Sequence, residues 1–400
     1  MNVQELKERA LASVDLLADE IVDHANRLLA LPEIGFREWR THDYLLKVME
    51  RIPFHCVETQ SSIPGIKATL QAVTPGSTIA VLADMDAVPD AVDGDSARRA
   101  RHSCGHYAQG AHMLGCAAAL AKCGILSELR GSVAFLACPA EEYVDLAWRY
   151  ERIADQTIRG ISGKLDFWEK GWFKGIGGAI SVHLADDLPA AKIVLPEECD
   201  GVCAFDIVLA AYSTGLSQVS PRENRKLEWI FRSWLVGLSS WTEIVEWDMK
   251  IIETEKQSKN CSVYRLTCLW TGKSPSSRIK EALLSFGSER ALSIDVRSYP
   301  DYEPLCACPK LQRIVKENAA LIAGPLATSH ASHIRGATDL GNISQKIPVI
   351  HPFVGGTSGH THTPEFCVVN EYTAYVLPVK LLCAVIIDWL TGEGRMEISQ

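Results

Sequence analysis

The chain has 400 residues, of which 47% are hydrophobic and 22% are charged. These proportions are ordinary for a globular protein of two or three domains, and they exclude a disordered, collagen-like or coiled-coil chain. The 40 Lys and Arg residues against 49 Asp and Glu residues give a net charge of -9. Because no basic stripe reverses this charge locally, we expect no nucleic-acid partner.

Three features of the sequence predict the cellular location of the protein. Residues 1–36 have an amphipathic helical pattern without the apolar stretch of a signal peptide. The best candidate for a membrane span, residues 375–390, contains Lys380 and a proline, which argues against a span. The 13 cysteines follow no repeating frame, which is typical of reduced thiols rather than of a disulfide scaffold. The sequence therefore predicts a soluble, cytoplasmic chain with no membrane partner.

Up to about residue 196, helical periodicity alternates with short apolar runs typical of strands. The runs cover residues 78–83, 132–137 and 179–182. Alternation of this kind favours an α/β fold with a mainly parallel sheet.

Residues 202–298 predict a different order of strands and helices. Their patterns predict strands at 204–211, 246–253, 262–270 and 290–297, with helices at 222–238 and 276–286. The order β-α-β-β-α-β is the split-βαβ pattern of a small two-layer domain. The first helix carries a continuous apolar face: Leu227, Ile230, Phe231, Trp234, Leu235 and Leu238.

After Tyr299 and Pro300 the α/β alternation resumes. A helix is predicted at 311–323, a strand at 348–350 and a closing helix at 374–390. We therefore predict a discontinuous catalytic domain of residues 1–199 and 300–400, interrupted by an inserted domain of residues 200–299.

Five short segments hold nearly all the side chains that could bind a metal ion. They are ADMDAVP (83–89), HSCGH (102–106), PAEE (139–142), SVHL (181–184) and GHTHTPEF (359–366). Most of them follow an apolar run, where an α/β sheet presents its functional loops. In the second segment, Gly105 allows a tight turn that directs a thiolate and an imidazole at one point, and zinc favours both ligands.

Each segment taken singly also has a structural explanation. A histidine at the end of a strand is more often a hydrogen-bonded structural residue, and a buried cysteine is normally a small hydrophobe. Together, however, the thiolate, imidazole and carboxylate groups form a ligand set for one or two divalent ions, and zinc and manganese both suit it. The adjacent Glu141 and Glu142 point in opposite directions if the loop is extended, so one can bind metal while the other acts as a general base.

In this order the segments resemble the aminoacylase/metallo-carboxypeptidase family. Within it they are similar to the amidohydrolase branch of hippurate, auxin-conjugate and aminobenzoyl-glutamate hydrolases. HANRLLALPEIGFRE (24–38) and ATDLGNIS (337–344) match as well. The resemblance implies a phosphorylase/hydrolase-like α/β catalytic domain with a ferredoxin-like α+β lid and dimerisation domain. It also implies a homodimer or larger homo-oligomer acting on a small-molecule substrate.

The resemblance implies a role for each matching residue. Glu141 matches the general base, and Asp86 resembles the carboxylate that orients a ligand histidine. Cys104 resembles a thiolate that bridges two metal ions. The metal ligands implied in this way are Cys104, His106, Glu142, His183 and His362. His360 lies two residues from His362 and is a nearby alternative.

The sequence departs from the family pattern at two places. Tyr107 stands where an aspartate usually follows Cys-Gly-His, which puts metal affinity and stoichiometry in doubt. The lid normally carries a histidine that stabilises the oxyanion, but here the matching stretch is residues 212–217 and no histidine occurs in residues 200–299. Ser213, Thr214 or a backbone N–H would have to replace it. Arg297 resembles a position that can pair with a substrate carboxylate, although an ordinary surface arginine explains it equally well. Thr214, His360 and Tyr107 are the other candidate substrate-binding residues.

These observations leave three functions open. The first is a metal-dependent hydrolase that cleaves a C–N bond other than an ordinary peptide bond, in an N-acyl amino acid or an aryl amide. The second is a hydrolytic deaminase of an electron-poor aromatic amine, similar to a nitroanthranilate aminohydrolase, for which the missing lid histidine would be unnecessary. The third is a non-catalytic binding protein, which the presence of Glu141 disfavours because such a protein needs no general base.

Overall fold

The structure is a computed structural model that describes residues 2–90, 100–190, 192–211, 229–235, 237, 244–251, 261–290 and 292–392. The chain divides into two compact units. The larger unit comprises residues 1–197, 306–332 and 343–400, and the smaller unit comprises residues 198–305 and 333–342. The smaller unit therefore includes a segment, 333–342, that lies outside the predicted insert of residues 200–299. Two hydrogen bonds join this segment to the rest of the smaller unit. The Gly336 N–H donates to Asp200, and the Glu303 N–H donates to Asn342.

A six-stranded sheet forms the centre of the larger unit. Its strands, in spatial order, are β1 (Cys56–Thr59), β2 (Ile66–Gln71), β6 (Arg130–Cys138), β3 (Thr74–Asp84), β7 (Ile176–Ile180) and β15 (Val349–Ile350). β6, β3, β7 and β15 pair in parallel with one another, whereas β2 pairs antiparallel with both β1 and β6. The mainly parallel α/β sheet predicted from the apolar runs is thus confirmed, with the three runs in β3, β6 and β7.

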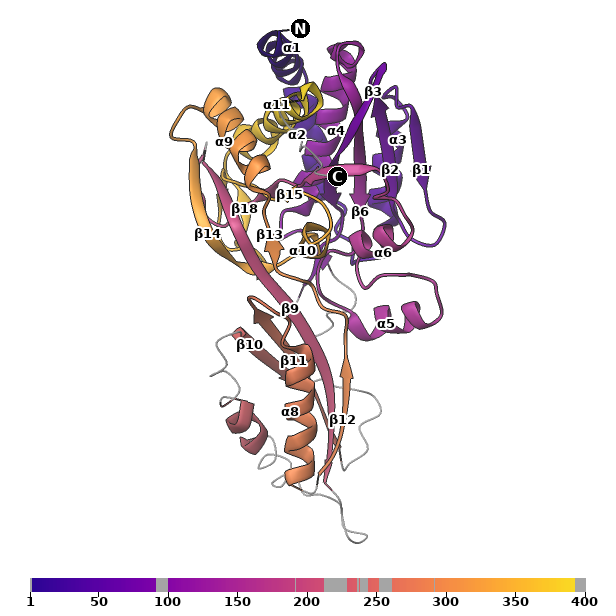
Figure 1. Cartoon of the computed structure of the whole chain (residues 1–400), viewed down its shortest axis with the longest axis vertical. Helices are drawn as coiled ribbons and strands as arrows, with labels where there is room; N and C mark the ends of the chain where they lie inside the picture. The colour runs from indigo at the N-terminus through magenta and orange to yellow at the C-terminus, as the bar shows by residue number, and fades with distance from the viewer. Residues whose placement is uncertain are drawn as a thin grey trace, which may run out of the picture. The chain divides into compact units, whose positions relative to one another are not determined.

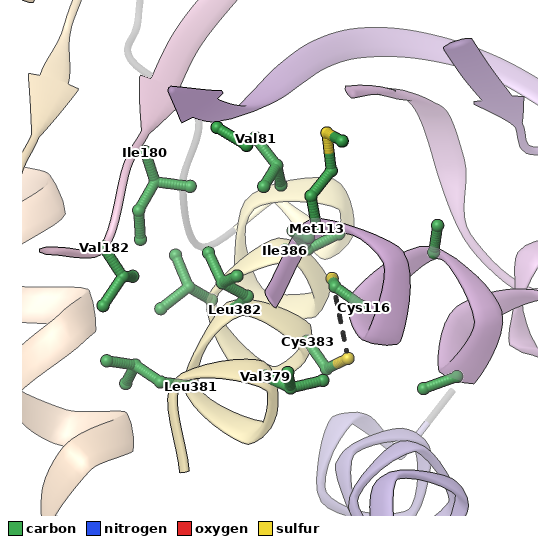
Figure 2. Close-up of a cluster of buried hydrophobic side chains, with 14 of the residues drawn as sticks. Val81, Met113, Cys116, Ile180, Val182, Val379, Leu381, Leu382, Cys383 and Ile386 are labelled. Carbon is green, nitrogen blue, oxygen red and sulfur yellow. Dashed lines mark hydrogen bonds between the residues drawn. The ribbon is translucent and has the colours of Figure 1, made fainter. Parts of the chain in front are cut away.

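Helices α4 (His106–Lys122) and α11 (Leu377–Thr391) pack against β3 and against each other (Figure 1). Small residues in α4, such as Gly110 and Gly115, allow close contact with α2 (Ala18–Leu29), because an added Cβ would lie within 2.8 Å of Leu28 or Ile21. Figure 2 shows the resulting core between strand and helix residues. The residues labelled there are buried: Val81, Met113, Cys116, Ile180, Val182, Val379, Leu381, Leu382, Cys383 and Ile386.

The closing helix was expected at 374–390, and it has two parts. Residues Tyr372–Val376 form a π-helical turn, and α11 follows with Pro378 in its first turn, where a missing N–H costs no hydrogen bond. Together they form one helix, Tyr372–Thr391, that is apolar enough to cross a membrane, but 94% of the tested window is buried inside the protein. A buried core helix passes the same test of length and composition.

The smaller unit is built on an antiparallel sheet. β9 (Ile193–Ala211) pairs with β11 (Cys261–Trp270) on one side and with β12 (Leu292–Ser298) on the other, and β10 (Ile244–Ile251) pairs with β11. α8 (Ser276–Glu289) and a helical segment at 229–235 cover this sheet with Leu283, Phe286 and Phe231, which are fully buried. These elements follow the predicted β-α-β-β-α-β order, although residues 222–228 of the first predicted helix lie outside the described part.

The remaining elements are short or peripheral. The helices are α1 (Val3–Leu16), α3 (Trp39–Met49), η2 (Ile125–Ser127), α5 (Leu146–Ala154), α6 (Gly163–Glu169), α9 (Pro309–Ala323) and α10 (Leu340–Ser344). The strands are β4 (Val88–Pro89), β5 (Ala100–Arg101), β8 (His183–Leu184), β13 (Leu305–Cys306), β14 (Thr328–Ala337), β16 (Phe353–Val354), β17 (Thr357–Ser358) and β18 (Cys367–Val368).

Candidate metal centre

The motif residues gather at one edge of the parallel sheet. β3 ends at Asp84, β6 at Cys138 and β7 at Ile180, and these strands are paired in parallel register. The carboxyl ends of parallel strands lie at the same edge, so the loops that carry Asp86, Glu141 and His183 are neighbours.

The Cys104-Gly105-His106 turn starts helix α4 beside these loops. Gly105 has a φ of 97°, in the left-handed region where glycine carries no Cβ penalty. An added Cβ would also lie 3.1 Å from the Cβ of Leu184. The predicted tight turn at Gly105 is therefore the local structure that brings the thiol of Cys104 and the imidazole of His106 to the same place.

Among the described residues, three groups of side chains could each hold a metal ion, because the ligand atoms within each group lie within 4.8 Å of one another. They are Cys104, His106 and His183; Cys104, Glu142 and His362; and His106, Glu141 and Glu142. The Cys104 Sγ belongs to two of these groups and lies 3.4 Å from His183 Nε2. The structure thus brings together all five residues expected as metal ligands, and two of the groups share the thiol of Cys104.

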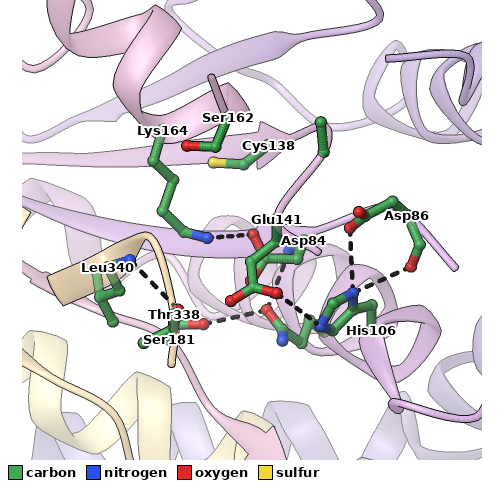
Figure 3. A network of polar contacts seen from close by, with 12 residues as sticks. Asp84, Asp86, His106, Cys138, Glu141, Ser162, Lys164, Ser181, Thr338 and Leu340 are labelled. Atoms are coloured by element: carbon green, nitrogen blue, oxygen red, sulfur yellow. Dashed lines mark hydrogen bonds and ion pairs between the residues drawn. The ribbon is translucent and has the colours of Figure 1, made fainter. Parts of the chain in front are cut away.

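Hydrogen bonds direct the free nitrogen of two histidines toward this centre. His183 Nδ1 donates to the Leu184 carbonyl at 2.6 Å. His106 Nδ1 lies 3.0 Å from the Asp86 carbonyl oxygen and 3.2 Å from Asp86 Oδ1 (Figure 3). A ring whose Nδ1 is engaged in this way can offer Nε2 as a ligand, which is the arrangement found in metal-binding histidines. The residues present therefore fit a divalent metal ion.

Asp86 connects two of the candidate ligands. Its side chain is fully buried, with Oδ1 at His106 and Oδ2 accepting the N–H of Glu142 at 3.0 Å. A carboxylate in this position orients both the imidazole ring and the backbone that carries Glu142. Asp86 thus acts on the candidate ligands His106 and Glu142 and is not itself a candidate ligand.

The pKa values of Cys104 and Glu142 favour their ligand forms. Burial and Glu142 act to raise the pKa of Cys104, but His106 and His183 outweigh them and the pKa is lowered to about 6. Burial also acts to raise the pKa of Glu142, but its interactions with His362 and His106 lower that pKa to about 2. A thiolate and a carboxylate are the forms of these groups that bind metal ions.

Glu141 has the opposite electrostatic character. Burial raises the pKa of Glu141 well above its ordinary value, and His106 opposes this only in part. Its Oε2 lies 3.7 Å from His106 Nε2. A buried carboxyl group with a raised pKa, next to the ligand cluster, is the kind of group that can accept and return a proton during hydrolysis.

His362 and His360 differ in position. His362 has a left-handed φ of 64°, its N–H donates to the Ser103 carbonyl, and its Nε2 lies 3.3 Å from Glu142 Oε1. The side chain of His360 is 79% exposed and lies 3.5 Å from Asp186. The geometry therefore favours His362 over His360 as a ligand.

The other residues expected to contact substrate belong to none of these ligand groups or lie outside the described residues. Tyr107 is buried, with its hydroxyl 3.1 Å from the hydroxyl of Tyr375. Arg297 is an exposed residue of β12, opposite Asp206 of β9. Thr214 and the whole segment 212–217 lie outside the described residues, so the group that would replace the lid histidine stays a prediction. The smaller unit does contain one described histidine, His333, which lies 2.8 Å from Asp200.

Sequence reasoning missed a buried polar network behind Glu141 (Figure 3). Lys164 of α6 is fully buried and forms an ion pair with Asp84 at the end of β3. Gln109 of α4 accepts hydrogen bonds from the backbone N–H of Asp84 and from Ser181, both at 3.0 Å. The sequence did indicate that two carboxylates, Asp84 and Asp86, lie at the end of this strand. No local signal marks Lys164, since lysine is almost always exposed unless it is paired.

An α/β sheet whose carboxyl edge gathers thiolate, imidazole and carboxylate groups is typical of metal-dependent hydrolases. The chain belongs to Peptidase family M20/M25/M40, whose family model matches residues 80–386. This match confirms the resemblance to the aminoacylase/metallo-carboxypeptidase family that the motifs indicate.

Two curated relatives cover part of the chain. An N-acetyldiaminopimelate deacetylase of Bacillus cytotoxicus is 31% identical over 117 residues, which are 28% of this chain and 30% of the relative. Thermostable carboxypeptidase 1 of Saccharolobus solfataricus is 23% identical over 191 residues, 46% of this chain and 44% of the relative. The chain thus spans less than half the length of these relatives.

A solved structure shares the fold over nearly the whole chain. The YxeP protein of Bacillus subtilis, described as a dinuclear metal-binding peptidase of the M20 family, superposes with a TM-score of 0.69 at 19% identity. The superposition covers 94% of this chain and 99% of YxeP. At this identity the likeness is one of fold, and the fold class predicted from the sequence is confirmed.

Proposed function

We propose that this protein is a metal-dependent hydrolase that cleaves the C–N bond of a small, carboxylate-bearing N-acyl amino acid or aryl amide. The observation that carries the proposal is Cys104 Sγ, which lies within reach of two separate groups of ligand atoms, with Glu141 beside them. The family supports hydrolysis, and the deacetylase among the relatives supports an N-acyl amino acid.

The five clustered side chains of Cys104, His106, Glu142, His183 and His362 would hold one or two divalent ions. Manganese and zinc both suit a mixed set of thiolate, imidazole and carboxylate ligands. A bound ion would act as a Lewis acid that lowers the pKa of a water molecule and polarises the scissile carbonyl.

Glu141 would move the proton. As the water oxygen attacks the carbonyl carbon, the Glu141 carboxylate takes a proton from the water, and it then returns this proton to the leaving nitrogen. The C–N bond breaks, and the products are a carboxylic acid and an amine. Asp86 keeps the His106 ring and the Glu142 backbone fixed during these steps through its two carboxylate oxygens.

The developing negative charge on the carbonyl oxygen needs a further donor. Removing one such donor typically costs about 10²–10³ in rate. We propose that Thr214, Ser213 or a backbone N–H of that stretch supplies it in place of a histidine, and that Arg297 pairs with the substrate carboxylate.

The proposal is tested by analysing products in heavy-oxygen water. The manganese- or zinc-loaded protein is offered N-acetyl amino acids, aryl amides, dipeptides and electron-poor anthranilates, and the products are identified by mass spectrometry. We expect the label in a carboxylate released from an N-acetyl amino acid or an aryl amide. Cleavage of dipeptides alone would contradict the preference for non-peptide bonds.

The same experiment tests the second candidate function. The sequence observation that favours a deaminase is the absence of histidine from residues 200–299. In hydrolytic deamination the charge would spread into an electron-poor ring, so no oxyanion histidine is needed. Label in a phenol, with ammonia released from an anthranilate, would replace the amidohydrolase proposal by this one. With a metal-loaded protein, no turnover of any compound would favour the binding-protein alternative.

A further inference from the structure

The segment 33–38 has no role in the proposed reaction, yet it wraps around the turn that carries Glu141. Glu38 is fully buried, and its Oε1 accepts the N–H of Ala140 at 2.7 Å. At the other end of the segment, the Glu33 carbonyl accepts the N–H of Ala87, next to Asp86. The segment therefore contacts the backbone beside both acidic motif loops.

A second buried side chain holds the other side of Ala140. Arg149 of α5 has no exposed surface, and its Nη1 donates to the Ala140 carbonyl at 3.2 Å and to the Ile161 carbonyl at 3.1 Å. Its guanidinium also lies 5.4 Å from the ring of Phe36. The N–H and the C=O of Ala140 are thus each bound by a side chain from a different part of the chain.

The backbone at Ala140 is in a conformation that alanine rarely adopts. Its φ is 58°, in the left-handed region, and such residues persist only where the surroundings fix them. This conformation turns the chain immediately before Glu141 and Glu142. Gly35 is required for the packing, because an added Cβ would lie 2.4 Å from Arg149 Nη2 and 2.8 Å from the Cα of Ala140.

We propose that Glu38 and Arg149 are positioning residues that hold Ala140 in the left-handed conformation and thereby aim the carboxyl group of Glu141, while Asp86 separately holds the backbone N–H of Glu142. The catalytic role of Glu141 in this proposal rests on the proposed function. The holding of Ala140 by Glu38 and Arg149 does not depend on that function. A small displacement of a reacting group by a change elsewhere can lower the rate about 100-fold.

The central comparison is Glu38→Ala with Glu38→Gln. Glutamine keeps the acceptor oxygen and nearly the same size, and its uncharged amide suits a buried position where burial raises the pKa of the Glu38 carboxyl well above its ordinary value. With an N-acetyl amino acid as substrate, we expect Glu38→Ala to lower kcat about 100-fold while KM changes less than about threefold. Glu38→Gln should retain kcat within about tenfold, and the bound metal per folded molecule should equal that of the wild type in both variants.

Arg149→Met should behave like Glu38→Ala. The matched control is Arg152→Met on the same helix, because Arg152 is partly exposed and forms an ion pair with the helix-end residue Asp155 at 2.9 Å. We expect this control to leave kcat unchanged. Equal loss of kcat in Glu38→Ala and Glu38→Gln, in proportion to the loss of folded protein, would indicate a merely structural role and overturn the proposal.

Hydrogen exchange supplies a readout that needs no substrate. In Glu38→Ala, a proteolytic fragment spanning residues 136–144 should exchange its amide protons faster than in Glu38→Gln, because the Ala140 N–H has lost its acceptor. If the wild type turns over no compound, the proposed function fails, and this exchange measurement still decides the structural part. Exchange at the same rate in both variants would overturn it.

Discussion

At the scale of single residues, neighbouring carboxyl groups have opposite properties. Glu142 faces two histidines and has a pKa of about 2, whereas burial raises the pKa of Glu141 well above its ordinary value. Their contacts differ: Asp86 holds the N–H of Glu142, and Glu141 Oε2 lies 3.7 Å from His106 Nε2. Under the proposed function, this difference would let Glu142 bind metal while Glu141 carries protons.

We predict that Glu141→Gln retains the wild-type metal content and loses turnover. General acid–base catalysis contributes about 10²–10⁴ in rate, so kcat should fall by about that factor. The measurement pairs turnover of the best substrate from the panel with metal analysis of the same sample. Glu142→Gln is the matched control and should lose metal as well as activity. A fully active Glu141→Gln protein would show that another group is the base.

At the scale of elements, helix α4 connects the ligand turn to the core. It starts with His106, and its inner face is buried against α2, α11 and β3. Six residues after His106, the buried His112 donates from Nε2 to the Ala374 carbonyl at 2.8 Å. This bond joins α4 to the π-helical turn before α11, where the backbone carbonyls depart from the α-helical pattern.

His112 should make stability depend on pH. Burial lowers its pKa from 6.5 to about 4, although the hydrogen bond to Ala374 acts in the other direction. Between these two pH values the unfolded chain binds the proton more tightly, so the stabilising contribution is present above pH 6.5 and is lost as the pH falls toward 4. The difference corresponds to about 3 kcal/mol.

The matched variant for this prediction is His112→Gln, which keeps an N–H donor but does not titrate. Urea unfolding of the metal-free protein at pH 7 and pH 4 should show the wild type losing about 3 kcal/mol more stability than the variant. Other buried groups titrate in both proteins and cancel in the comparison. Parallel stability curves for the two proteins would contradict the assignment.

The sequence predicts these elements well where the pattern is local. The apolar runs at 78–83, 132–137 and 179–182 lie in β3, β6 and β7, and the Cys104-Gly105-His106 turn has the predicted form. The antiparallel β2 was not predicted, since a short strand after a loop carries no signal of direction. The closing helix was predicted, but its π-helical start was not.

Contacts that depend on topology were not predictable from the sequence. Glu38 and Ala140 are 102 positions apart, and Lys164 and Asp84 are 80 apart. A charged residue inside an amphipathic pattern normally indicates an exposed position, because burying it is costly unless a partner is present. That partner is identified only when the order of the strands is known. The motifs therefore located the candidate ligands but not the residues that support them.

At the scale of the whole molecule, the family and the sheet explain why the ligand residues come from most of the length of the chain. Candidate ligands stand at residue 104 and at residue 362, and both belong to the larger unit. The smaller unit has its own core around Phe205, Phe231 and Phe286. Its role as a lid and dimerisation domain stays a prediction.

We predict that the protein is a dimer or larger assembly formed through this smaller unit. In this unit the side chain of Trp229 is 70% exposed and that of Leu284 is 43% exposed. Among the described strands, β10 pairs with β11 alone, so its other edge is open. Exposed aromatic side chains and an open strand edge are features of surfaces that associate. Sedimentation velocity at micromolar concentration should therefore show a species of at least twice the 44.0 kDa chain mass.

A charged substitution tests which surface is used. Trp229→Glu should weaken association at least about tenfold, because it replaces an apolar side chain by a charge that the interface would have to desolvate. Leu326→Glu is the matched control, since Leu326 is 81% exposed but belongs to the larger unit. We expect it to leave the assembly unchanged. A monomeric wild type would contradict the assembly itself, and an unaffected Trp229→Glu dimer would move the interface away from Trp229.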